Sequence, residues 1–422
     1  MGVSHDLLSL MQKRIPGQLV IQFTDHCNAR CPQCGMRVTE AFPRTKLSVD
    51  RIKRILDRAS ETGIKIVSFT GGEPLLFLDE LVVLIKYAGS AGIEYIRTGT
   101  NGFLFTQPER PGFRSRVNRI AEMLADTPLR NLWISIDSAI PSVHEKMRGF
   151  PGVIAGIEEA VPIFHGHGIY PSANLGINRN IGGAGSVSDG CRPADEDYLP
   201  LFMKDMKAAF RSFYRFAINM GFTIINTCYP MSIHGLNGNA SLKPIYAANS
   251  TDYIVHYSSG EKAMLFRALM ETVPEFRSKS RIFSPRCSLD SLYRQYAQGT
   301  MSDYPCRGGI DCFFIDSKDG NAYPCGFRGK ENLGDFCELD REKLNREPFC
   351  HHCDWECFRD PSEMFGPILH ARRNPFGLLK NIANRGSYFK IWMEDLRYYL
   401  ACDFFDGRKP PAYDRLSAWQ GS

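Results

Sequence analysis

The chain has 422 residues, enough for two or three domains of roughly 150 residues each or for one large barrel with an appendage. With 43% hydrophobic and 23% charged residues, it has the composition of a globular protein, which excludes a mainly disordered, collagen-like or coiled-coil chain. Lys and Arg outnumber Asp and Glu by 51 to 46, a mild basic excess that allows an anionic ligand without requiring nucleic acid.

Residues 1–17 are predicted to be a short N-terminal extension. The opening run MGVSHDLLSLMQKRIPGQ is too polar for a signal peptide, and Asp6 stands where myristoylation requires Ser or Thr. No apolar run approaches the ~18 residues needed to cross a bilayer. We therefore expect a cytoplasmic protein, in which cysteines are kept reduced.

From residue 18 to residue 228, strand-like and helix-like patterns alternate. The predicted strands are 18–24, 64–70, 93–99, 131–137, 172–178 and 222–228, and the predicted helices are 48–62, 78–91, 114–126, 151–168 and 197–220. Near-continuous apolar strands that alternate with helices are typical of a parallel sheet. We expect a partial (β/α)6 TIM-like barrel over residues 18–230, with its chemistry at the carboxyl ends of the strands.

The remaining segments are assigned from composition. A Gly/Ser-rich loop at 179–196 is either a lid over a substrate or a plain flexible connection. Residues 231–284 are predicted to be an insert or linker with one helix at 259–273, and 285–360 a cysteine-rich domain. The tail, 361–422, is predicted to be helical: either an amphipathic helix packed on the body or a helix that binds a membrane surface or a partner.

The chain contains 14 cysteines, and the first group directly follows the first predicted strand. Cys27, Cys31 and Cys34 have the spacing C-x3-C-x2-C, which lets one loop supply three thiolates to an iron–sulfur cube. A cube needs four ligands and no fourth cysteine is near, so one iron is left for a non-protein ligand. A zinc site that includes His26 is the alternative.

A second motif, Gly71-Gly72-Glu73-Pro74, follows the second predicted strand. Two glycines allow a backbone to approach a ligand closely, and the glutamate can accept hydrogen bonds from an ammonium group. Four residues alone would indicate only a turn. The motif gains weight from its position, one strand after the cysteine loop.

Together these two motifs resemble those of the radical S-adenosylmethionine (SAM) enzymes. The resemblance implies that Cys27, Cys31 and Cys34 ligate a [4Fe–4S] cluster whose open iron is chelated by SAM. It implies that Gly71, Gly72 and Glu73 hold the methionyl ammonium. It further implies reductive cleavage of SAM to a 5′-deoxyadenosyl radical, which abstracts hydrogen from a substrate carbon.

Polar residues at later strand ends agree with this resemblance. Asn101 follows the third predicted strand, and Ser135 and Asp137 end the fourth, ahead of H144-E-K-M-R148-G149. This is similar to the S-x-D…H-x-x-x-R-G pattern of the molybdenum-cofactor and peptide-maturing members, and it implies that Ser135 and Asp137 face the ribose or carboxylate of SAM. Further contacts to SAM are expected from Asn178, Asn180 and the backbone around Gln33, which replaces a frequent aromatic residue.

The second cysteine group lies between Cys306 and Cys357. Asp319-Gly320 predicts a hairpin with a type I′ turn, across which Cys306 or Cys312 meets Cys325. The pair Cys350 and Cys353 can then complete a site of four thiolates. A structural zinc ribbon is the alternative.

This block also resembles the SPASM and twitch extensions of radical SAM enzymes. The twitch pattern implies one auxiliary [4Fe–4S] cluster on Cys306, Cys325, Cys350 and Cys353. A second assignment groups Cys306, Cys312, Cys325 and Cys357, and leaves Cys350 and Cys353 to a second cluster with Cys337 or Cys402. Outside the clusters, His351 and His352 are expected to face solvent, and Cys191, Cys228 and Cys287 to be small buried hydrophobic residues.

The resemblance implies a radical SAM enzyme that modifies a peptide or protein and takes electrons from a flavodoxin- or ferredoxin-type donor. Two alternatives remain: a radical SAM enzyme that oxidises or rearranges a small metabolite, sugar or lipid, and a non-catalytic iron–sulfur or zinc protein. No nucleic-acid partner is expected, and contact with a membrane surface is the less favoured reading of the tail.

Overall fold

The computed structural model describes residues 14–35, 44–183, 193, 195–230, 242–245, 250, 252–341, 343–344, 347–351 and 353–420. None of the helices in these ranges is long and apolar enough to cross a membrane.

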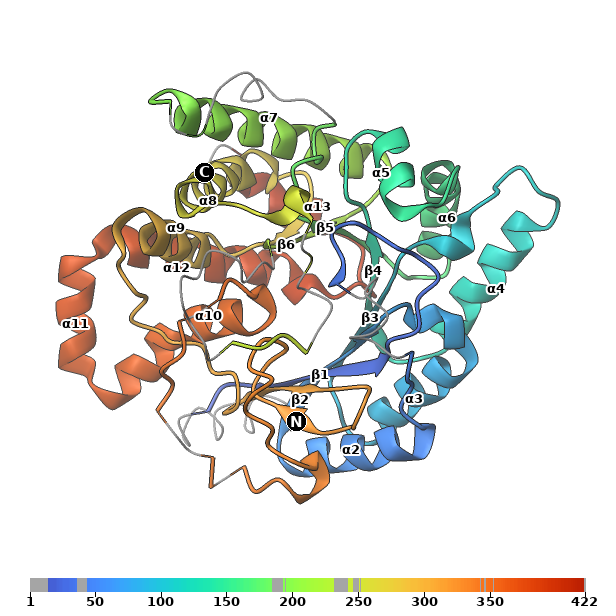
Figure 1. The fold of residues 1–422 in the computed structure, drawn as a ribbon, viewed down its shortest axis with the longest axis horizontal. Helices are drawn as coiled ribbons and strands as arrows, with labels where there is room; N and C mark the ends of the chain where they lie inside the picture. Colours follow the sequence, from blue (N-terminus) through green and yellow to red (C-terminus); the bar gives the residue numbers. More distant parts are fainter. Residues whose placement is uncertain are drawn as a thin grey trace.

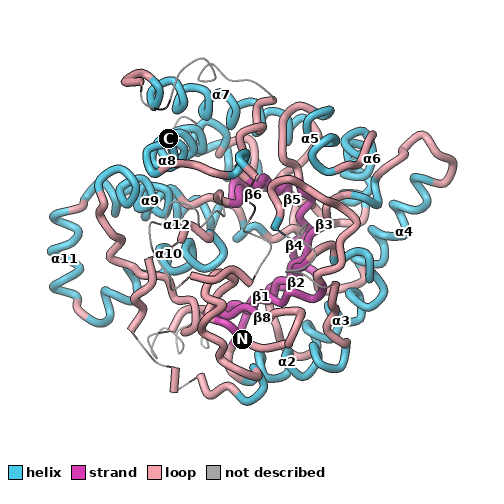
Figure 2. Tube along the Cα trace, in the orientation of Figure 1, coloured by secondary structure: helices cyan, strands magenta, loops and turns pink. Residues whose placement is uncertain are grey.

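Nine strands form one sheet, in the order β7-β6-β5-β4-β3-β2-β1-β8-β9. Neighbouring strands from β7 to β8 are parallel, and β9 pairs with β8 in the antiparallel direction. Figure 2 shows that the strands follow an arc rather than a flat layer. The predicted parallel α/β fold is therefore confirmed. The strands are β1 (Gly17–Thr24), β2 (Ile64–Gly71), β3 (Tyr95–Thr100), β4 (Leu129–Ser135), β5 (Ser172–Gly176), β6 (Ile224–Cys228), β7 (Arg281–Phe283), β8 (Cys312–Ile315) and β9 (Ala322–Tyr323).

Helices cover the convex side of this arc (Figure 1). They are α2 (Val49–Glu61), α3 (Leu78–Ser90), α4 (Phe113–Ala125), α5 (Pro141–Arg148), α6 (Val153–Gly166) and α7 (Tyr198–Asn219). In α2, the side chain of Ser48 caps the helix by accepting the Arg51 N–H, and Ile52, Ile55 and Leu56 form the buried stripe. The predicted strand and helix positions are confirmed to within a few residues, whereas α5 was not predicted.

The two faces of the central strands differ in burial. In β4, Leu132 and Ile134 face the helices and are fully buried, whereas Trp133 and Ser135 alternate with them and are only half-buried. The same alternation occurs in β5 and β6, where the half-buried positions are Asn174, Gly176, Asn226 and Cys228. Because successive side chains of a strand point to opposite faces, these residues line the concave side of the arc, which solvent reaches.

The concave side of the arc faces the C-terminal half of the chain (Figures 1 and 2). This half contains α8 (Ser259–Thr272), α9 (Arg286–Gln298), α10 (Glu356–Arg373), α11 (Pro375–Asn384), α12 (Gly386–Ala401) and α13 (Tyr413–Leu416). The predicted helix 259–273 corresponds to α8, which begins with a capping box between Ser258 and Glu261. In the tail, α12 contacts α9 and buries Tyr388 and Tyr398, as expected for a helix packed on the body, whereas α11 has no buried residue.

The predicted hairpin in the cysteine-rich region is confirmed, but its turn differs from the prediction. β8 and β9 pair through Phe314↔Tyr323 and Ile315↔Ala322, and six residues connect them. Gly320 has a φ of 69°, but Asp319 has no positive φ, which excludes a type I′ turn. Instead, a longer loop joins the two strands, and the Gly320 N–H closes it by donating to the Asp316 carbonyl.

Short 3-10 helices complete the description. They are η2 (Pro74–Phe77), η3 (Phe103–Phe105), η5 (Tyr253–Val255), η6 (Val273–Phe276), η7 (Phe336–Glu338), η8 (Asp403–Phe405) and η9 (Ser417–Trp419).

Candidate functional site

The cysteine loop that follows β1 is fixed to the end of β2 by backbone contacts. The Gly72 N–H donates to the Thr24 carbonyl and the Glu73 N–H to the His26 carbonyl, both at 2.8 Å. A Cβ on Gly71 would lie 2.0 Å from the Thr24 oxygen, and one on Gly72 would lie 2.0 Å from the His26 oxygen. The glycines were expected to admit a ligand; the contacts observed are with the loop that carries the three cysteines.

The three cysteines of this loop lie close enough to interact electrostatically. Cys31 is influenced by both Cys27 and Cys34, and the Cys34 N–H donates to the Cys31 carbonyl at 3.1 Å. Burial raises the pKa of Cys27 and raises that of Cys31 to about 12, so these thiols hold their protons until a metal displaces them.

Within the described ranges, no group of three or more His, Cys, Asp or Glu side chains is arranged to hold a metal ion. A single zinc ion requires four ligands about 2.1–2.3 Å from one point. A four-iron cube is larger, so its ligands lie farther apart. The three thiols thus form no closed zinc site among the described residues.

Glu73 is buried beside this loop and forms no salt bridge among the described residues, although the charge of Arg148 acts on it. Its Oε1 accepts the Leu75 N–H at 3.0 Å, which begins η2, and its Oε2 accepts the Asn101 N–H at 2.6 Å. Pro74, the first residue of η2, is also buried. Burial raises the pKa of Glu73 to about 7. A buried carboxylate with no ion pair is a suitable partner for an ammonium group.

Asn101 connects this carboxylate to the cysteine loop. Besides the contact of its N–H with Glu73, its Nδ2 donates to Asn28 Oδ1 at 2.9 Å and approaches Cys27 Sγ at 3.8 Å. The ends of β1, β2 and β3 therefore form one connected polar site.

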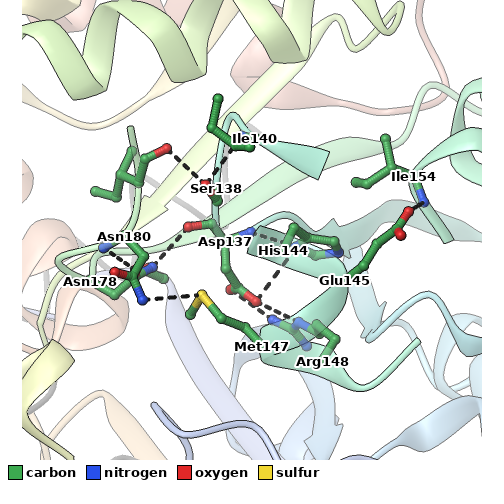
Figure 3. A network of polar contacts seen from close by, with 12 residues as sticks. Asp137, Ser138, Ile140, His144, Glu145, Met147, Arg148, Ile154, Asn178 and Asn180 are labelled. Atoms are coloured by element: carbon green, nitrogen blue, oxygen red, sulfur yellow. Dashed lines mark hydrogen bonds and ion pairs between the residues drawn. The ribbon is translucent and has the colours of Figure 1, made fainter. Parts of the chain in front are cut away.

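Asp137 is engaged by an ion pair with Arg148, which ends α5 (Figure 3). Arg148 Nε donates to Asp137 Oδ2 at 2.6 Å, and Nη2 donates to Oδ1 at 2.9 Å. Burial opposes ionisation of Asp137, but the Arg148 charge and hydrogen bonds outweigh it and keep its pKa below the usual value. The carboxylate, predicted to face SAM, thus has both oxygens directed at Arg148.

His144 supports this pair from the next turn of α5. The Asp137 N–H donates to His144 Nδ1 at 3.0 Å, and the imidazole is fully buried. Burial lowers the pKa of His144 to about 4, so it is neutral at physiological pH. A neutral acceptor at this position helps fix Asp137, and Asp137 in turn fixes the guanidinium of Arg148.

Arg148 is the residue that the sequence prediction passed over. Its charge interacts with Cys31 and Cys34, as well as with Asp137. A cation close to thiols favours their ionised form. The signal was present in the sequence as the arginine of the H-x-x-x-R-G run, but its partner, Asp137, could not be identified from spacing alone.

Asn178 joins the ends of β4 and β5. Its Nδ2 donates to the Asp137 carbonyl at 2.9 Å and to the Gly176 carbonyl at 2.8 Å, while its Oδ1 accepts the Asn180 N–H at 2.8 Å (Figure 3). The Asn180 Nδ2 approaches Met147 Sδ at 3.8 Å. Both asparagines therefore have structural partners, and their contacts to SAM stay a prediction, as do those of Ser135. Most of the proposed lid at 179–196, with Cys191, lies outside the described residues.

Gln22 is a second feature that sequence reasoning did not identify. Its neighbours in β1, Ile21 and Phe23, belong to the main apolar core, so Gln22 points to the opposite face of the sheet. Gln22 is fully buried, and neither its amide oxygen nor its amide nitrogen has a hydrogen-bond partner. Buried amides are normally paired, so this side chain indicates where a ligand or water completes the concave face. An isolated glutamine in an apolar strand carries no sequence signal for that role.

In the second cysteine group, four residues come together. The Cys306 N–H donates to the Cys350 carbonyl at 2.9 Å, and Cys325 and Cys353 each interact electrostatically with both. Burial raises the pKa of Cys306 to about 11 and that of Cys325 to about 12, so both thiols are protonated at neutral pH.

The other predicted ligands of this region have different neighbours. Cys312, in β8, interacts with Cys306, whereas Cys357 interacts mainly with Glu356 and Arg97. Cys337 lies in η7 beside Asp335 and Arg51, and Cys402 lies beside Tyr398 and Arg281. The placement agrees with the first assignment better than with the second, although the ligand set itself stays a prediction. His352 lies outside the described residues.

Comparisons with known proteins find similarity in one part of the first half of the chain. Residues 21–179 match the Radical SAM superfamily. The chain is 32% identical over 147 residues to the AdoMet-dependent heme synthase of Methanosarcina barkeri. This match covers 34% of this chain and 38% of that protein. The chain is 32% identical over 146 residues to the probable GTP 3′,8-cyclase of Thermococcus kodakarensis, covering 34% and 43%. The chain thus spans about two fifths of these curated relatives.

Two solved structures match more of the chain, at lower sequence identity. anSMEcpe with bound AdoMet covers 78% of this chain and 79% of that one at 17% identity, with a TM-score of 0.47. SuiB of Streptococcus suis bound to S-adenosylmethionine covers 82% and 70% at 16% identity, with a TM-score of 0.49.

Proposed function

Because residues 21–179 belong to the radical SAM superfamily, we propose that this protein is an enzyme that holds a [4Fe–4S] cluster on Cys27, Cys31 and Cys34, with SAM beside it. When bound, these groups supply the one-electron cleavage of SAM that produces a 5′-deoxyadenosyl radical for hydrogen abstraction. The observation that carries the proposal is a loop of three interacting thiols, fixed by backbone hydrogen bonds to a turn that presents a buried carboxylate without a salt bridge.

Glu73 has the role of accepting the methionyl ammonium of SAM. Two backbone N–H groups orient its carboxylate, and no cation among the described residues occupies it. An ammonium beside it would stabilise the ionised form that burial now disfavours. Asn101 connects Glu73 to the cysteine loop, because its N–H donates to Glu73 and its side chain donates to Asn28.

Arg148 has the role of stabilising negative charge at the three thiolates. It is held by both oxygens of Asp137, so its guanidinium keeps one orientation as the charge of the site changes. Asp137 is then a positioning residue for Arg148. Ser135, on the concave face of β4, remains our candidate for a contact to the ribose.

For the substrate, we favour a segment of peptide or protein. The described residues that line the concave face of β4, β5 and β6 are uncharged, several of them are polar, and Glu356 adds an acid near Cys228. Arg97 is a cation on the same face, where it donates to Ser68. A nucleoside triphosphate would require several cations, so this lining suits an uncharged or cationic substrate better. A small metabolite, sugar or lipid is the second candidate.

We further propose that Cys306, Cys325, Cys350 and Cys353 hold one auxiliary [4Fe–4S] cluster. Four mutually interacting thiols match the number of ligands that a complete cube needs. Arg328, whose Nη1 donates to the Gly308 carbonyl, interacts with Cys325 and Cys350 and offsets part of the thiolate charge.

Anaerobic reconstitution tests these proposals. About eight irons per chain support one auxiliary cluster and about twelve support two. Addition of SAM to the reduced protein should change the electron paramagnetic resonance signal of one cluster only, and dithionite should then yield deoxyadenosine. A protein that binds iron but shows neither response to SAM contradicts the enzyme proposal.

A further inference from the structure

Helix α11 presents apolar side chains to solvent along one face. Phe376, Leu379 and Ile382 are 83%, 62% and 39% exposed, and their spacing of three residues places them on one side of the helix. We call these three residues the α11 apolar face. Figure 1 shows α11 at the edge of the molecule, between α10 and α12. Large apolar side chains that are exposed as a group are typical of a surface that binds a partner or a membrane.

The other side of α11 is fixed to the body of the protein. Leu378 packs against the apolar cluster around α12. At the start of the helix, Asn374 Oδ1 accepts the Gly377 N–H at 2.8 Å. After its end, Arg385 forms an ion pair with Asp303 at 2.6 Å. The α11 apolar face therefore belongs to a helix that is already formed and anchored, so binding does not have to order it.

The chain around this face is basic. Residues 364–393 contain no Asp or Glu and five Lys or Arg. Two of the five form ion pairs with acidic residues of other segments. The other three are exposed and form no ion pair with any residue that the structure describes: Arg372, Lys380 and Lys390. Positive charge that the protein does not compensate is thus present on α11 and on the helices that precede and follow it.

We propose that the α11 apolar face binds the surface of a membrane that contains anionic lipids. Phe376 and Leu379 enter the boundary between headgroups and acyl chains, and the three uncompensated cations lie at the level of the negatively charged headgroups. This binding is independent of the proposed function, because neither the apolar face nor the cations belong to the candidate site.

The combination of apolar side chains and positive charge distinguishes a membrane from other occupants. A second copy of this chain, docked through the same face, would bring the uncompensated cations of both copies together, and like charges repel. A nucleic acid would pair with the cations but would leave Phe376 and Leu379 without apolar contacts. An anionic lipid surface offers an apolar layer and negative charge side by side, so it matches both features.

Binding to vesicles tests the proposal. The reconstituted full chain, without SAM or reductant, is mixed with vesicles of phosphatidylcholine and phosphatidylglycerol in equal amounts or with vesicles of phosphatidylcholine alone. Flotation then measures the bound fraction. We expect binding to the anionic vesicles, at least about tenfold weaker binding to the neutral ones, and a loss of binding as the salt concentration is raised.

Two substitutions separate the contributions of apolar contact and charge. Phe376→Ser removes the most exposed apolar side chain of the face and should weaken binding at least about tenfold. Lys380→Gln removes one cation and should weaken it about fivefold. The matched control is Val83→Ser, which changes a 47% exposed apolar residue of α3, across the molecule from α11 in Figure 1, and should leave binding unchanged. Circular dichroism confirms that the variants are folded.

A spectroscopic readout reports the position of the helix directly. In Phe376→Trp, the fluorescence of the added indole, obtained by subtracting the wild-type spectrum, should shift to shorter wavelength when anionic vesicles are added. The shift is expected because the ring leaves water for the headgroup boundary. Neutral vesicles at the same lipid concentration should give a smaller shift.

The possible outcomes are distinct. Equal binding of the wild-type protein and Phe376→Ser overturns the proposal, as does absence of binding to anionic vesicles. A dimer in sedimentation velocity that Phe376→Ser dissociates, without vesicle binding, assigns the face to a second copy and also overturns it. Failure of the same preparation to cleave SAM contradicts the proposed function and leaves the membrane proposal standing.

Discussion

The two cysteine groups differ in what surrounds their sulfurs. The loop after β1 presents three thiols, with Arg148 and the buried carboxylate of Glu73 nearby. The C-terminal group gathers four thiols, and hydrogen bonds between its own backbone segments close it. On our proposal, the first site would leave one ligand position of its cluster to a small molecule, and the second would supply all four ligands from the protein. The number of sulfurs thus separates a candidate reaction centre from a candidate electron site.

Removal of Cys31 should have the largest effect. The variant Cys31→Ala loses the central thiol of the first group, so we expect about four fewer irons per chain and no deoxyadenosine under dithionite. The C-terminal group should keep its iron. The measurements are iron and sulfide analysis with chromatography of the products, with Cys287→Ala as the matched control. Deoxyadenosine from the Cys31 variant would show that the two groups have been assigned the wrong way round.

Removal of Cys325 should give the complementary result. Cys325→Ala is expected to lower iron by about four per chain while SAM still perturbs the remaining cluster. Turnover of substrate should stop or be diverted, because the second site no longer exchanges electrons. If electron paramagnetic resonance shows no response to SAM in this variant, the two sites are not independent.

Substitution of Arg148 tests the ion pair that accompanies the first cysteine group and not the second. Arg148→Met leaves Asp137 buried without its partner, and breaking such a pair costs about 3 kcal/mol or more in the free energy of unfolding. Urea denaturation of the cofactor-free protein measures this loss. The double variant with Asp137→Asn should recover part of it, since the unpaired charge is gone. An additive loss in the double variant would contradict the ion pair.

The raised pKa of Glu73, beside the first cysteine group, predicts that the stability of the folded protein depends on pH. Its pKa is about 7 in the folded protein and 4.5 when exposed, so the folded state binds the extra proton between these values. The contribution of Glu73 to stability should be fully present below pH 4.5 and fall by about 3 kcal/mol as the pH rises to 7, then level off. In Glu73→Gln this fall should disappear from unfolding curves measured across that range. A fall of equal size in the variant would assign it to other groups.

Cys337 should show the smallest effect. It lies in η7 beside Asp335 and Arg51, apart from the four grouped thiols. Cys337→Ala is therefore expected to leave the iron content and the SAM response unchanged. A loss of iron would instead favour the assignment with a second auxiliary cluster.

Periodicity in the sequence was enough to predict the barrel. The strands that carry the site were placed within a few residues, because apolar runs and amphipathic helices alternate locally. Helix α5 was missed because its sequence matched a functional motif, although Pro141 at its start and Gly149 after its end are ordinary helix boundaries. The pairing of β8 with β1 was also missed, since it joins residues almost 300 positions apart.

The site was predictable to the extent that its residues are adjacent in the chain. Cysteine spacing and the Gly-Gly-Glu-Pro run are local signals. The Asp137–Arg148 pair, the unpaired amide of Gln22 and the meeting of Cys228 with Glu356 depend on how strands and helices are brought together. Such contacts follow from packing, which no single segment encodes.

The hydrogen bonding of β8 to β1 affects how this protein can be divided. A fragment that ends before residue 306 would keep the barrel strands but leave the backbone groups on one edge of β1 without partners. Val20, which packs against the C-terminal apolar cluster, would be exposed with them. Unprotected edges of this kind promote aggregation. A truncated barrel is therefore expected to be insoluble, and the cysteine-rich region acts as a structural closure whether or not it carries a metal.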